Sequence, residues 1–370
     1  MMTVMAGATI APSLPEMSKA FPDNPSAEAL VKLVLTIPGL FIALTSPISG
    51  WIIDKYGRIK LLVTMLVLYA IAGASGLFLN TLVEIIIGRA LLGVAVGGIM
   101  TTAVALIGDY YEGQERQKFL GVQAGIMALS GTLFIPMGGI LADIGWRYPF
   151  AIYLIALIAA PMVSLFLKEP ERITSSSTSE KVEIPKLAWT IYVISFLGMV
   201  VFYLMPVQIP FLMLEISDMG NTETGLALSI VMLVGGIMSF QYPKLKSRLS
   251  HYQIYGILFL FMGIGYYLIS QATSYWTTFP GLFISGLGAG LLMPNSNLCL
   301  VTMASPENRG KVLGMLTTFI FIGQFASPIF FQPLVDTTNI QLGFAYLGYA
   351  LVGGSIIALI RNRKLVTSQT

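Results

Sequence analysis

Long apolar runs recur along the whole chain and alternate with short segments rich in charged and turn-forming residues. A helix needs about 20 predominantly apolar residues to cross the hydrocarbon core of a bilayer. The pattern therefore predicts an all-α polytopic membrane protein with twelve transmembrane helices. We expect them at residues 1–14, 30–53, 61–79, 83–108, 118–141, 148–167, 187–213, 223–243, 252–270, 275–302, 311–334 and 339–360.

The first apolar run is shorter than the others. As a helix, residues 1–14 would cover about 21 Å, against a hydrocarbon core of about 30 Å. We therefore expect part of the first helix to be missing from this sequence. A signal peptide is disfavoured, because no basic leader precedes the run and no small-residue cleavage site ends it.

Composition supports a membrane protein and disfavours several other classes. Only 11% of the residues are charged, less than half of the roughly 25% typical of soluble domains. Nucleic-acid binding and soluble enzyme activity are therefore disfavoured. The single cysteine, Cys299, is expected to be a buried, inert thiol, and the single histidine, His251, cannot build a metal site. With no metal-ligand spacing and no phosphate-binding loop, we expect no cofactor and no ATP-driven step.

The basic residues predict the orientation in the cell membrane. Of the 21 Lys and Arg residues, 17 fall in the loops after even-numbered helices or in the C-terminal tail. Basic loops are retained in the cytoplasm, so both termini are predicted to be cytoplasmic. The opposite, outer side receives only Lys19, Lys32 and Arg147, while Arg89 lies within a predicted helix.

A polar segment divides the chain into two halves. It predicts an N-terminal six-helix bundle at 1–167, a cytoplasmic linker at 168–186, a C-terminal six-helix bundle at 187–364 and a tail at 365–370. An internal repeat at an offset of 193 supports two pseudo-symmetric bundles. At this offset Gly88, Gly93 and Gly97 correspond to Gly281, Gly286 and Gly290, Gly121 to Gly314, and Lys55 to Arg248.

The loop between the second and third helices combines one acid with several bases. By itself this loop could be a positive-inside anchor. Its residues, however, resemble the signature of the major facilitator superfamily, G-x-x-x-D-(R/K)-x-G-(R/K), and the twelve-helix pattern extends the resemblance over the chain. The matching residues are Gly50, Asp54, Lys55, Gly57, Arg58 and Lys60.

The resemblance implies that this loop is a conformational latch between the two halves. Asp54 would face the N-terminal end of the eleventh helix near Gly310, and Arg58 would pair with Asp109 at the end of the fourth helix. The latch would close only in the outward-facing state. The predicted latch comprises Gly50, Asp54, Lys55, Gly57, Arg58 and Asp109.

A buried arginine is predicted in the fourth helix. Arg89 with Gly93 four residues later resembles the superfamily signature that is associated with proton transfer, so Arg89 is the candidate for proton coupling. The alternative is that Arg89 extends to the outer interface, because a guanidinium in hydrocarbon costs about 2.5–3.5 kcal/mol on insertion scales. Glu84, near the outer end of the same helix, is expected to have an interfacial role.

The fifth helix is rich in glycine and partly resembles that of drug/proton antiporters. Those proteins carry a Gly-Pro pair shortly before the Gly-Gly pair; Phe134 and Ile135 stand at that place, and Pro136 follows one residue later. Close helix packing and a proline kink explain the same residues without antiport. The predicted packing and kink positions are Gly93, Gly97, Gly131, Pro136, Gly138 and Gly139.

Polar residues at membrane depth, with the apolar Phe202 and Met205 nearby, mark the predicted substrate cavity. Each polar residue could instead make a hydrogen bond between helices. Prolines interrupt the seventh and tenth helices, which would let backbone line a cavity. Since no acid lies at mid-depth, we expect a neutral to amphipathic substrate. The candidates are Gln123, Phe202, Tyr203, Gln208, Gln241, Asn295, Asn297 and Gln324.

These patterns and the resemblance predict a secondary-active transporter that moves a small organic molecule by alternating access. The preferred function is proton-coupled efflux of drugs or metabolites by a monomer in the lipid bilayer. Two alternatives stay open: a proton-coupled importer of a sugar, organic acid or other metabolite, and a membrane scaffold or receptor without transport. The latch charges disfavour the scaffold, since a static bundle has no need of them.

Overall fold

The computed structural model describes residues 1–170, 185–217, 219–305 and 308–367 of the 370-residue chain. Within these ranges, it does not describe the side chains of Asp54, Gln117, Ala124, Ala128 and 361–367. Eleven of the described helices are long and apolar enough to cross a membrane. The all-helical fold and the segment pattern predicted from the sequence are thereby confirmed.

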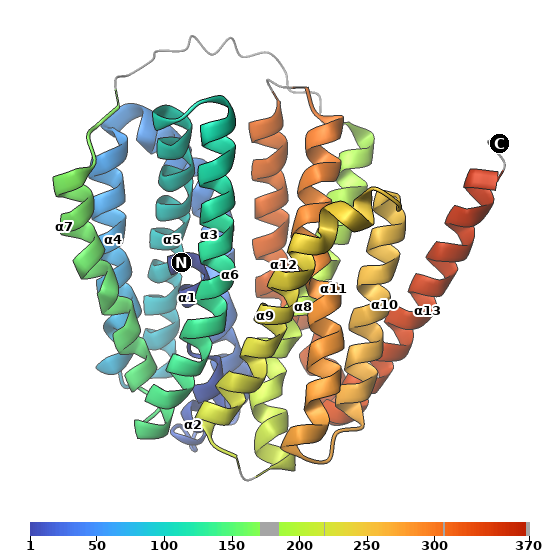
Figure 1. Ribbon diagram of the computed structural model, residues 1–370. Coiled ribbons are helices and arrows are strands. Elements are labelled where there is room, and N and C mark those ends of the chain that lie inside the picture. Colours follow the sequence, from blue (N-terminus) through green and yellow to red (C-terminus); the bar gives the residue numbers. More distant parts are fainter. Residues whose placement is uncertain (171–184, 218, 306–307, 368–370) are drawn as a thin grey trace.

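The helices of the two halves follow one another in a simple up-and-down order (Figure 1). The N-terminal half contains α1 (Met2–Ala8), η1 (Ala11–Ser13), α2 (Leu14–Lys19), α3 (Ala27–Tyr56), α4 (Arg58–Ala74), η2 (Ser75–Leu77), α5 (Leu82–Tyr110), α6 (Gly113–Ile144), η3 (Tyr148–Ile155) and α7 (Ala156–Phe166). The C-terminal half contains α8 (Lys186–Ile216), α9 (Asn221–Lys246), α10 (His251–Ser270), α11 (Tyr275–Met303), α12 (Arg309–Thr337) and α13 (Ile340–Thr367).

The first segment is broken, although a single helix over 1–14 was predicted. Its apolar residues are divided among α1, η1 and α2, because Pro12 and Pro15 have no backbone N–H to continue an α-helical ladder. Carbonyl oxygens of α1 accept side-chain hydrogen bonds instead. Tyr69 Oη donates to Met2 O at 3.0 Å, and Tyr153 Oη donates to Met5 O at 3.2 Å.

Each half packs as a bundle of long helices. In the first half, α5 lies against α3 and α4, and α4 lies against α7. In the second half, α11 lies against α9 and α10, α10 against α13, and α8 against α12. The two bundles meet mainly through α3 with α12 and α6 with α9.

The helix boundaries agree with the sequence repeat at an offset of 193. Shifted by this offset, the bounds of α5 become Tyr275 and Met303, which are the bounds of α11. The capping boxes correspond too: Thr81 with Glu84 begins α5, and Ser274 with Thr277 begins α11. The two halves are therefore built on the same plan.

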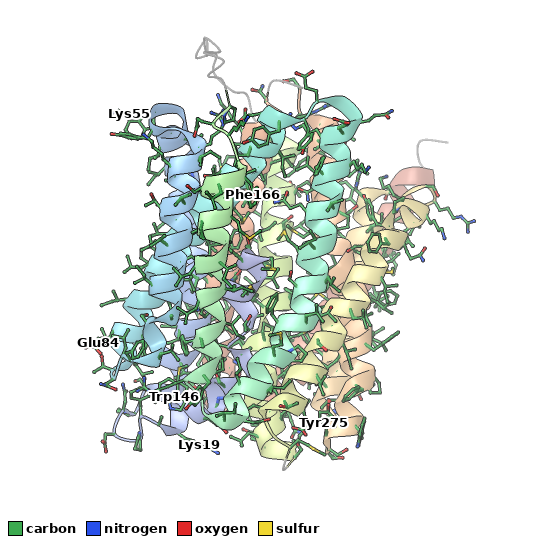
Figure 2. The ribbon with its side chains drawn as sticks, turned by 60° about the vertical axis from the view of Figure 1, so that its left-hand side comes forward. Lys19, Lys55, Glu84, Trp146, Phe166 and Tyr275 are labelled. Atoms are coloured by element: carbon green, nitrogen blue, oxygen red, sulfur yellow. The ribbon has the colours of Figure 1, made fainter. Side chains whose placement is uncertain are left out.

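The two ends of the bundles are named here by their connections. The linker end carries the last residues of α7 and the first of α8, and the far end is the opposite one. Figure 2 shows Lys55 and Phe166 toward the linker end, and Lys19, Glu84, Trp146 and Tyr275 at the far end.

Candidate functional site

The two bundles are in close contact in the half of the molecule nearer the far end. A Cβ added to Gly39 of α3 would lie 2.8 Å from Phe321 O of α12 and 3.3 Å from the Gln324 side chain. A Cβ added to Gly225 of α9 would lie 2.9 Å from Ile135 O of α6. Helix backbones therefore touch across the interface, and only glycine fits there.

A carboxylate at the far end reinforces this closure. Asp143, at the end of α6, accepts hydrogen bonds from the backbone N–H of Asn221 at 2.8 Å and of Thr222 at 3.2 Å, and from Thr222 Oγ1 at 2.5 Å. These amides begin α9, where the helix dipole favours negative charge. One bundle thus caps a helix of the other.

The same helices part at the linker end. Among the described residues of α3, α6 and α12, a Cβ added at six glycines would have no neighbour within 4 Å. The molecule is therefore closed at the far end and open at the linker end. These six positions are Gly50 of α3, Gly113, Gly121 and Gly125 of α6, and Gly310 and Gly314 of α12.

The predicted latch loop lies at the open end. Gly57 makes the sharp reversal between α3 and α4 with φ of +95°, a conformation that favours glycine. Arg58 Nη2 donates to Asp109 Oδ1 at 3.1 Å, which is the predicted pair. Both residues belong to the N-terminal half, and the pair is formed although the linker end is open, so this pair does not behave as the predicted latch that closes only in the outward-facing state. Lys55 lies 5.2 Å from the centre of the Trp51 ring. The Asp54 side chain lies outside the described residues, so its contact with the start of α12 stays a prediction.

Sequence reasoning missed a second acid in this loop region. The Glu169 carboxylate accepts hydrogen bonds from the backbone N–H of Arg58 at 2.5 Å and of Ile59 at 2.9 Å. It thereby caps the N-terminus of α4, although it follows α7 in the chain. The signal that could have found it is its position, since it directly follows a span at the same end as the basic loop.

Arg89 is buried inside the N-terminal bundle, with 1% of its surface exposed. Its Nε donates to Val34 O at 3.0 Å, its Nη1 to Tyr153 Oη at 2.7 Å, and its Nη2 to Ala6 O. The alternative that Arg89 extends to the interface is therefore wrong. The guanidinium ties the broken first segment to α3 and η3. Glu84 lies in the α5 capping box, in agreement with its expected interfacial role.

Two predicted cavity residues meet where the bundles come together. Tyr203 of α8 and Gln324 of α12 both lie beside Gly7 of α1. A Cβ added to Gly7 would lie 3.6 Å from Gln324 Nε2. Both side chains are buried, and both lie near the middle of their helices. Phe202 stands edge-on to the Tyr203 ring, with centroids 6.4 Å apart.

The other predicted cavity residues do not gather at this point. Asn295 is buried within the C-terminal bundle: its Oδ1 accepts from Tyr242 Oη at 3.2 Å, and its Nδ2 donates to His251 O at 3.0 Å. Gln208 is also buried, and neither of its amide atoms has a hydrogen-bond partner among the described residues. Gln241 and Asn297 are exposed on α9 and α11, and Gln123 is partly exposed on α6.

The predicted packing glycines lie at helix contacts. Gly93 and Gly97 of α5 face Pro38 and Thr45 of α3. On α6, which continues through Pro136, a Cβ would overlap a neighbour's backbone at two positions and would lie 3.1 Å from a methionine side chain at a third. These contacts are Gly138 with Thr9, Gly139 with Asn221, and Gly131 with Met232.

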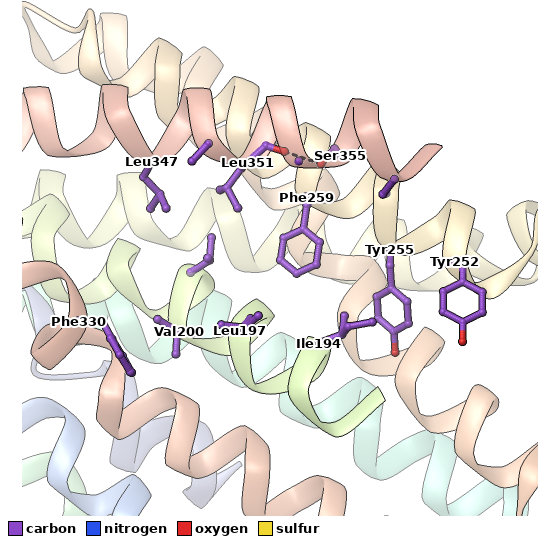
Figure 3. A pocket seen from close by; sticks show the side chains of 15 residues that line it. Ile194, Leu197, Val200, Tyr252, Tyr255, Phe259, Phe330, Leu347, Leu351 and Ser355 are labelled. Carbon is purple, nitrogen blue, oxygen red and sulfur yellow. Dashed lines mark hydrogen bonds between the residues drawn. The ribbon is translucent and has the colours of Figure 1, made fainter. Parts of the chain in front are cut away.

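A cavity of about 890 Å³ lies between α8, α10 and α13 (Figure 3). Its wall is almost wholly apolar, with Leu197, Phe259 and Leu351 among the lining residues. None of the eight predicted cavity residues lines it. It offers volume for apolar groups but few polar atoms that could orient a ligand.

A buried lysine at the bundle interface was not predicted. Lys32 was assigned to the outer side from its position near the start of a span, but its side chain is fully buried between α3, α8 and α12. The partners that bury it come from the other half of the sequence, so no local pattern announces them.

The fold and this interface define a class of protein. Two bundles of repeated design, touching through glycines at one end and parted at the other, are the architecture of a membrane transporter that works by alternating access. A sequence profile described as Major Facilitator Superfamily matches residues 1–328 and 189–368. The chain belongs to the major facilitator superfamily, a family of secondary transporters rather than enzymes.

Several characterised relatives are exporters by name. The chain is 26% identical to the multi-drug resistance efflux pump PmrA of Streptococcus pneumoniae, over 90% of this chain and 86% of that protein. It is 23% identical to the bacillibactin exporter of Bacillus subtilis (strain 168), over 84% of this chain and 82% of that one.

A solved structure shares the fold. The crystal structure of a D-xylose–proton symporter superposes with a TM-score of 0.77 at 16% sequence identity, covering 96% of this chain and 94% of that one. At this identity the likeness concerns the fold alone.

Proposed function

We propose that this transporter exports small, neutral to amphipathic organic molecules from the cytoplasm in exchange for protons. The observation that carries the proposal is the closed far end opposite an open linker end, which carries most of the basic residues. If the basic end is cytoplasmic, the structure is the inward-open state, in which an exporter loads its substrate. Relatives named as an exporter and as an efflux pump favour export over import.

The proposed substrate site is the interface around Tyr203 and Gln324. It lies near the middle of α8 and α12, on the linker-end side of the contacts that close the far end. Transporters of this architecture bind substrate near the bilayer midplane between the two repeats. A phenol and a carboxamide offer hydrogen bonds without a fixed charge, which suits a neutral polar group on an otherwise apolar substrate.

Proteoliposomes test this proposal directly. With the linker end facing outward and the lumen acidic, the wild type is expected to accumulate a lipophilic fluorescent dye in the lumen. Collapse of the pH gradient with an ionophore should abolish accumulation. Movement of labelled sugars or organic acids with protons instead would support the importer, and no flux with any substrate would overturn transport by this chain.

Variants locate the site in the same assay. Tyr203→Phe and Gln324→Ala should each raise the KM for the dye by about tenfold, the effect of losing one to two kilocalories per mole of binding. Thr64→Val is the matched control, because its hydroxyl bonds only to Lys60 O in its own helix and faces away from the interface. Unchanged KM values in both site variants would place the substrate elsewhere.

A further inference from the structure

Two charged side chains are fully buried in the described part of the chain, and they differ in what they can do with a proton. They are Arg89 and Lys32. A guanidinium stays charged at any pH the protein meets, whereas a lysine ammonium can release its proton. Arg89 also bonds only within the N-terminal half, to Val34, Tyr153 and Ala6. Lys32 is therefore the better placed of the two to link protonation to bundle movement.

Lys32 joins both bundles at the far end. Its Nζ donates to Glu28 Oε1 of its own helix at 2.5 Å and to Gln332 Oε1 of α12 at 2.8 Å. It also lies 4.6 Å from the centre of the Phe211 ring of α8, a cation–π distance. Gln332 Nε2 donates in turn to Asp336 Oδ1 at 2.7 Å. A chain of hydrogen bonds therefore crosses the interface from α3 to α12.

Acidic groups surround this ammonium from three helices. Glu28 of α3, Glu215 of α8 and Asp336 of α12 are the carboxylates that act on its charge. The further charged residues of the neighbouring elements near this end are Glu84 and Arg89 of α5 and Glu16 and Lys19 of α2. Lys32 has no exposed surface, whereas the Glu28 side chain is 46% exposed. Glu28 thus connects the buried ammonium to the far-end solution.

The geometry points to Lys32 as a proton-binding site whose occupancy controls the far end of the transporter. The protonated form holds α3 against α8 and α12, because the ammonium bonds to Gln332, stacks on Phe211 and attracts carboxylates of both helices. To load the site, a proton from the far-end solution passes through the Glu28 carboxylate to the neutral Nζ amine, which gives the ammonium and restores the carboxylate. For exchange, the ammonium then gives this proton up toward the open linker end, which restores the neutral amine. The neutral amine keeps no ionic hold on the other bundle, so the far end can open.

This inference rests on the proton coupling of the proposed function and adds its direction. Proton uptake from the far-end solution closes that end and favours the state that is open at the linker end. Uptake of an outer proton would thus prepare an exporter for substrate from the opposite side. The same chemistry is absent from the equivalent position of the second half, where Gly225 corresponds to Lys32.

Cysteine labelling at the far end tests the inference in the full-length protein. Ile135→Cys, in a Cys299→Ser background, places one thiol at the buried contact between α6 and α9. A membrane-impermeant maleimide added on the far-end side should label it faster as the pH rises. Lys32→Gln should be labelled about tenfold faster than the wild type at low pH, with little pH dependence. Lys32→Arg should stay slow at every pH.

Transport gives the second readout. Lys32→Arg keeps the charge but cannot release a proton, so it should lose pH-driven dye accumulation while its equilibrium dye binding stays within about twofold of the wild type. Gln332→Met keeps Lys32 and removes its α12 partner, and should show intermediate labelling. Lys19→Gln, an exposed lysine at the same end, should behave as the wild type.

The outcomes separate this inference from the proposed function. If Lys32→Arg retains pH-driven accumulation and a wild-type pH profile of labelling, Lys32 is not the coupling site, whatever the substrate. If Lys19→Gln changes labelling as much as Lys32→Gln, a general surface-charge effect replaces the inference. If the wild type itself moves no protons with substrate, the proposed antiport fails, and pH-independent wild-type labelling overturns the Lys32 mechanism as well.

Discussion

The two bundles share one plan but stabilise their interiors differently. The N-terminal bundle holds the buried cations Arg89 and Lys32, and at an offset of 193 the C-terminal bundle has Leu282 and Gly225 at these places. The latch acid Asp54 corresponds to Ser247. Among the described residues, the buried charged side chains thus lie in the N-terminal half.

Neutral hydrogen bonds and backbone contacts take the place of charge in the C-terminal bundle. Ser296 Oγ lies 2.8 Å from both Ser195 Oγ and Tyr255 Oη, which joins α8, α10 and α11. A Cβ added to Gly265 of α10 would lie 2.6 Å from Gly281 O of α11. Such close packing leaves little freedom for sliding between helices. These contacts hold α8, α10 and α11 of the C-terminal bundle together.

The largest expected effect comes from removing the buried guanidinium of the N-terminal half. Arg89→Gln leaves the oxygens of Ala6, Val34 and Tyr153 without their donors, each costing about 1–3 kcal/mol when buried. We expect a loss of at least about 3 kcal/mol, seen as a much lower melting temperature of the detergent-solubilised protein. The equivalent Leu282→Met should cost less than about 1.5 kcal/mol. Equal losses at both positions would contradict the difference between the halves.

Equivalent glycines provide the next test. In the C-terminal half, a methyl group at Gly290 would overlap the backbone of Gly235, which cannot rotate away. In the N-terminal half, a methyl group at Gly97 would meet the Thr45 hydroxyl, and that side chain can rotate away. We expect Gly290→Ala to destabilise by about 2 kcal/mol and Gly97→Ala by less than half of that. Thermal unfolding of the two variants tests this expectation, and a larger loss of stability in Gly97→Ala than in Gly290→Ala would contradict it.

A smaller effect is expected from the neutral network. Ser296→Ala removes a partner of both Ser195 and Tyr255, and should cost about 1 kcal/mol. Transport measured at a temperature well below unfolding should change little, because the network lies within one bundle. A strong transport defect without a stability loss would show that this network takes part in the cycle.

The smallest effect is expected from Asp143, whose carboxylate accepts hydrogen bonds across the bundle interface at the far end. Asp143→Asn weakens the cap on α9 by about 0.5–1 kcal/mol, which should raise the far-end-open population about two- to fivefold. Labelling of Ile135→Cys measures that population. The equivalent Asp336→Asn should shift it less, since the hydrogen bond that its carboxylate accepts comes from Gln332 in the same helix. The reverse order would show that the α3–α12 contact dominates closure.

Much of the fold could be predicted from the sequence because transmembrane helices are local features. Run lengths located the helices, and the repeat offset matched α5 to α11 in the structure. The break in the first segment was missed, because the predicted helix over 1–14 ran through Pro12. Whether the chain lacks earlier residues of that segment stays a prediction.

The site was less accessible to sequence reasoning, because its groups are assembled from both halves. The pattern identified polar residues such as Asn295 at membrane depth, but not that Tyr242 and His251 would occupy its hydrogen bonds. It assigned Lys32 to the outer side without predicting its burial, since that burial depends on Phe211 and Gln332, some 180 and 300 positions away. Arg89 was found because an arginine in an apolar run is conspicuous in any window.

The cap that Glu169 places on α4 also bears on how the two halves are tethered. It anchors the chain at the linker end of the N-terminal bundle, and α8 begins at Lys186. The stretch 170–185 between them has a contour length of about 55 Å when fully extended, well over the roughly 30 Å hydrocarbon thickness of a bilayer. A tether of that reach sets no tight limit on rotation of one bundle against the other. The halves must therefore find their register through the faces they share.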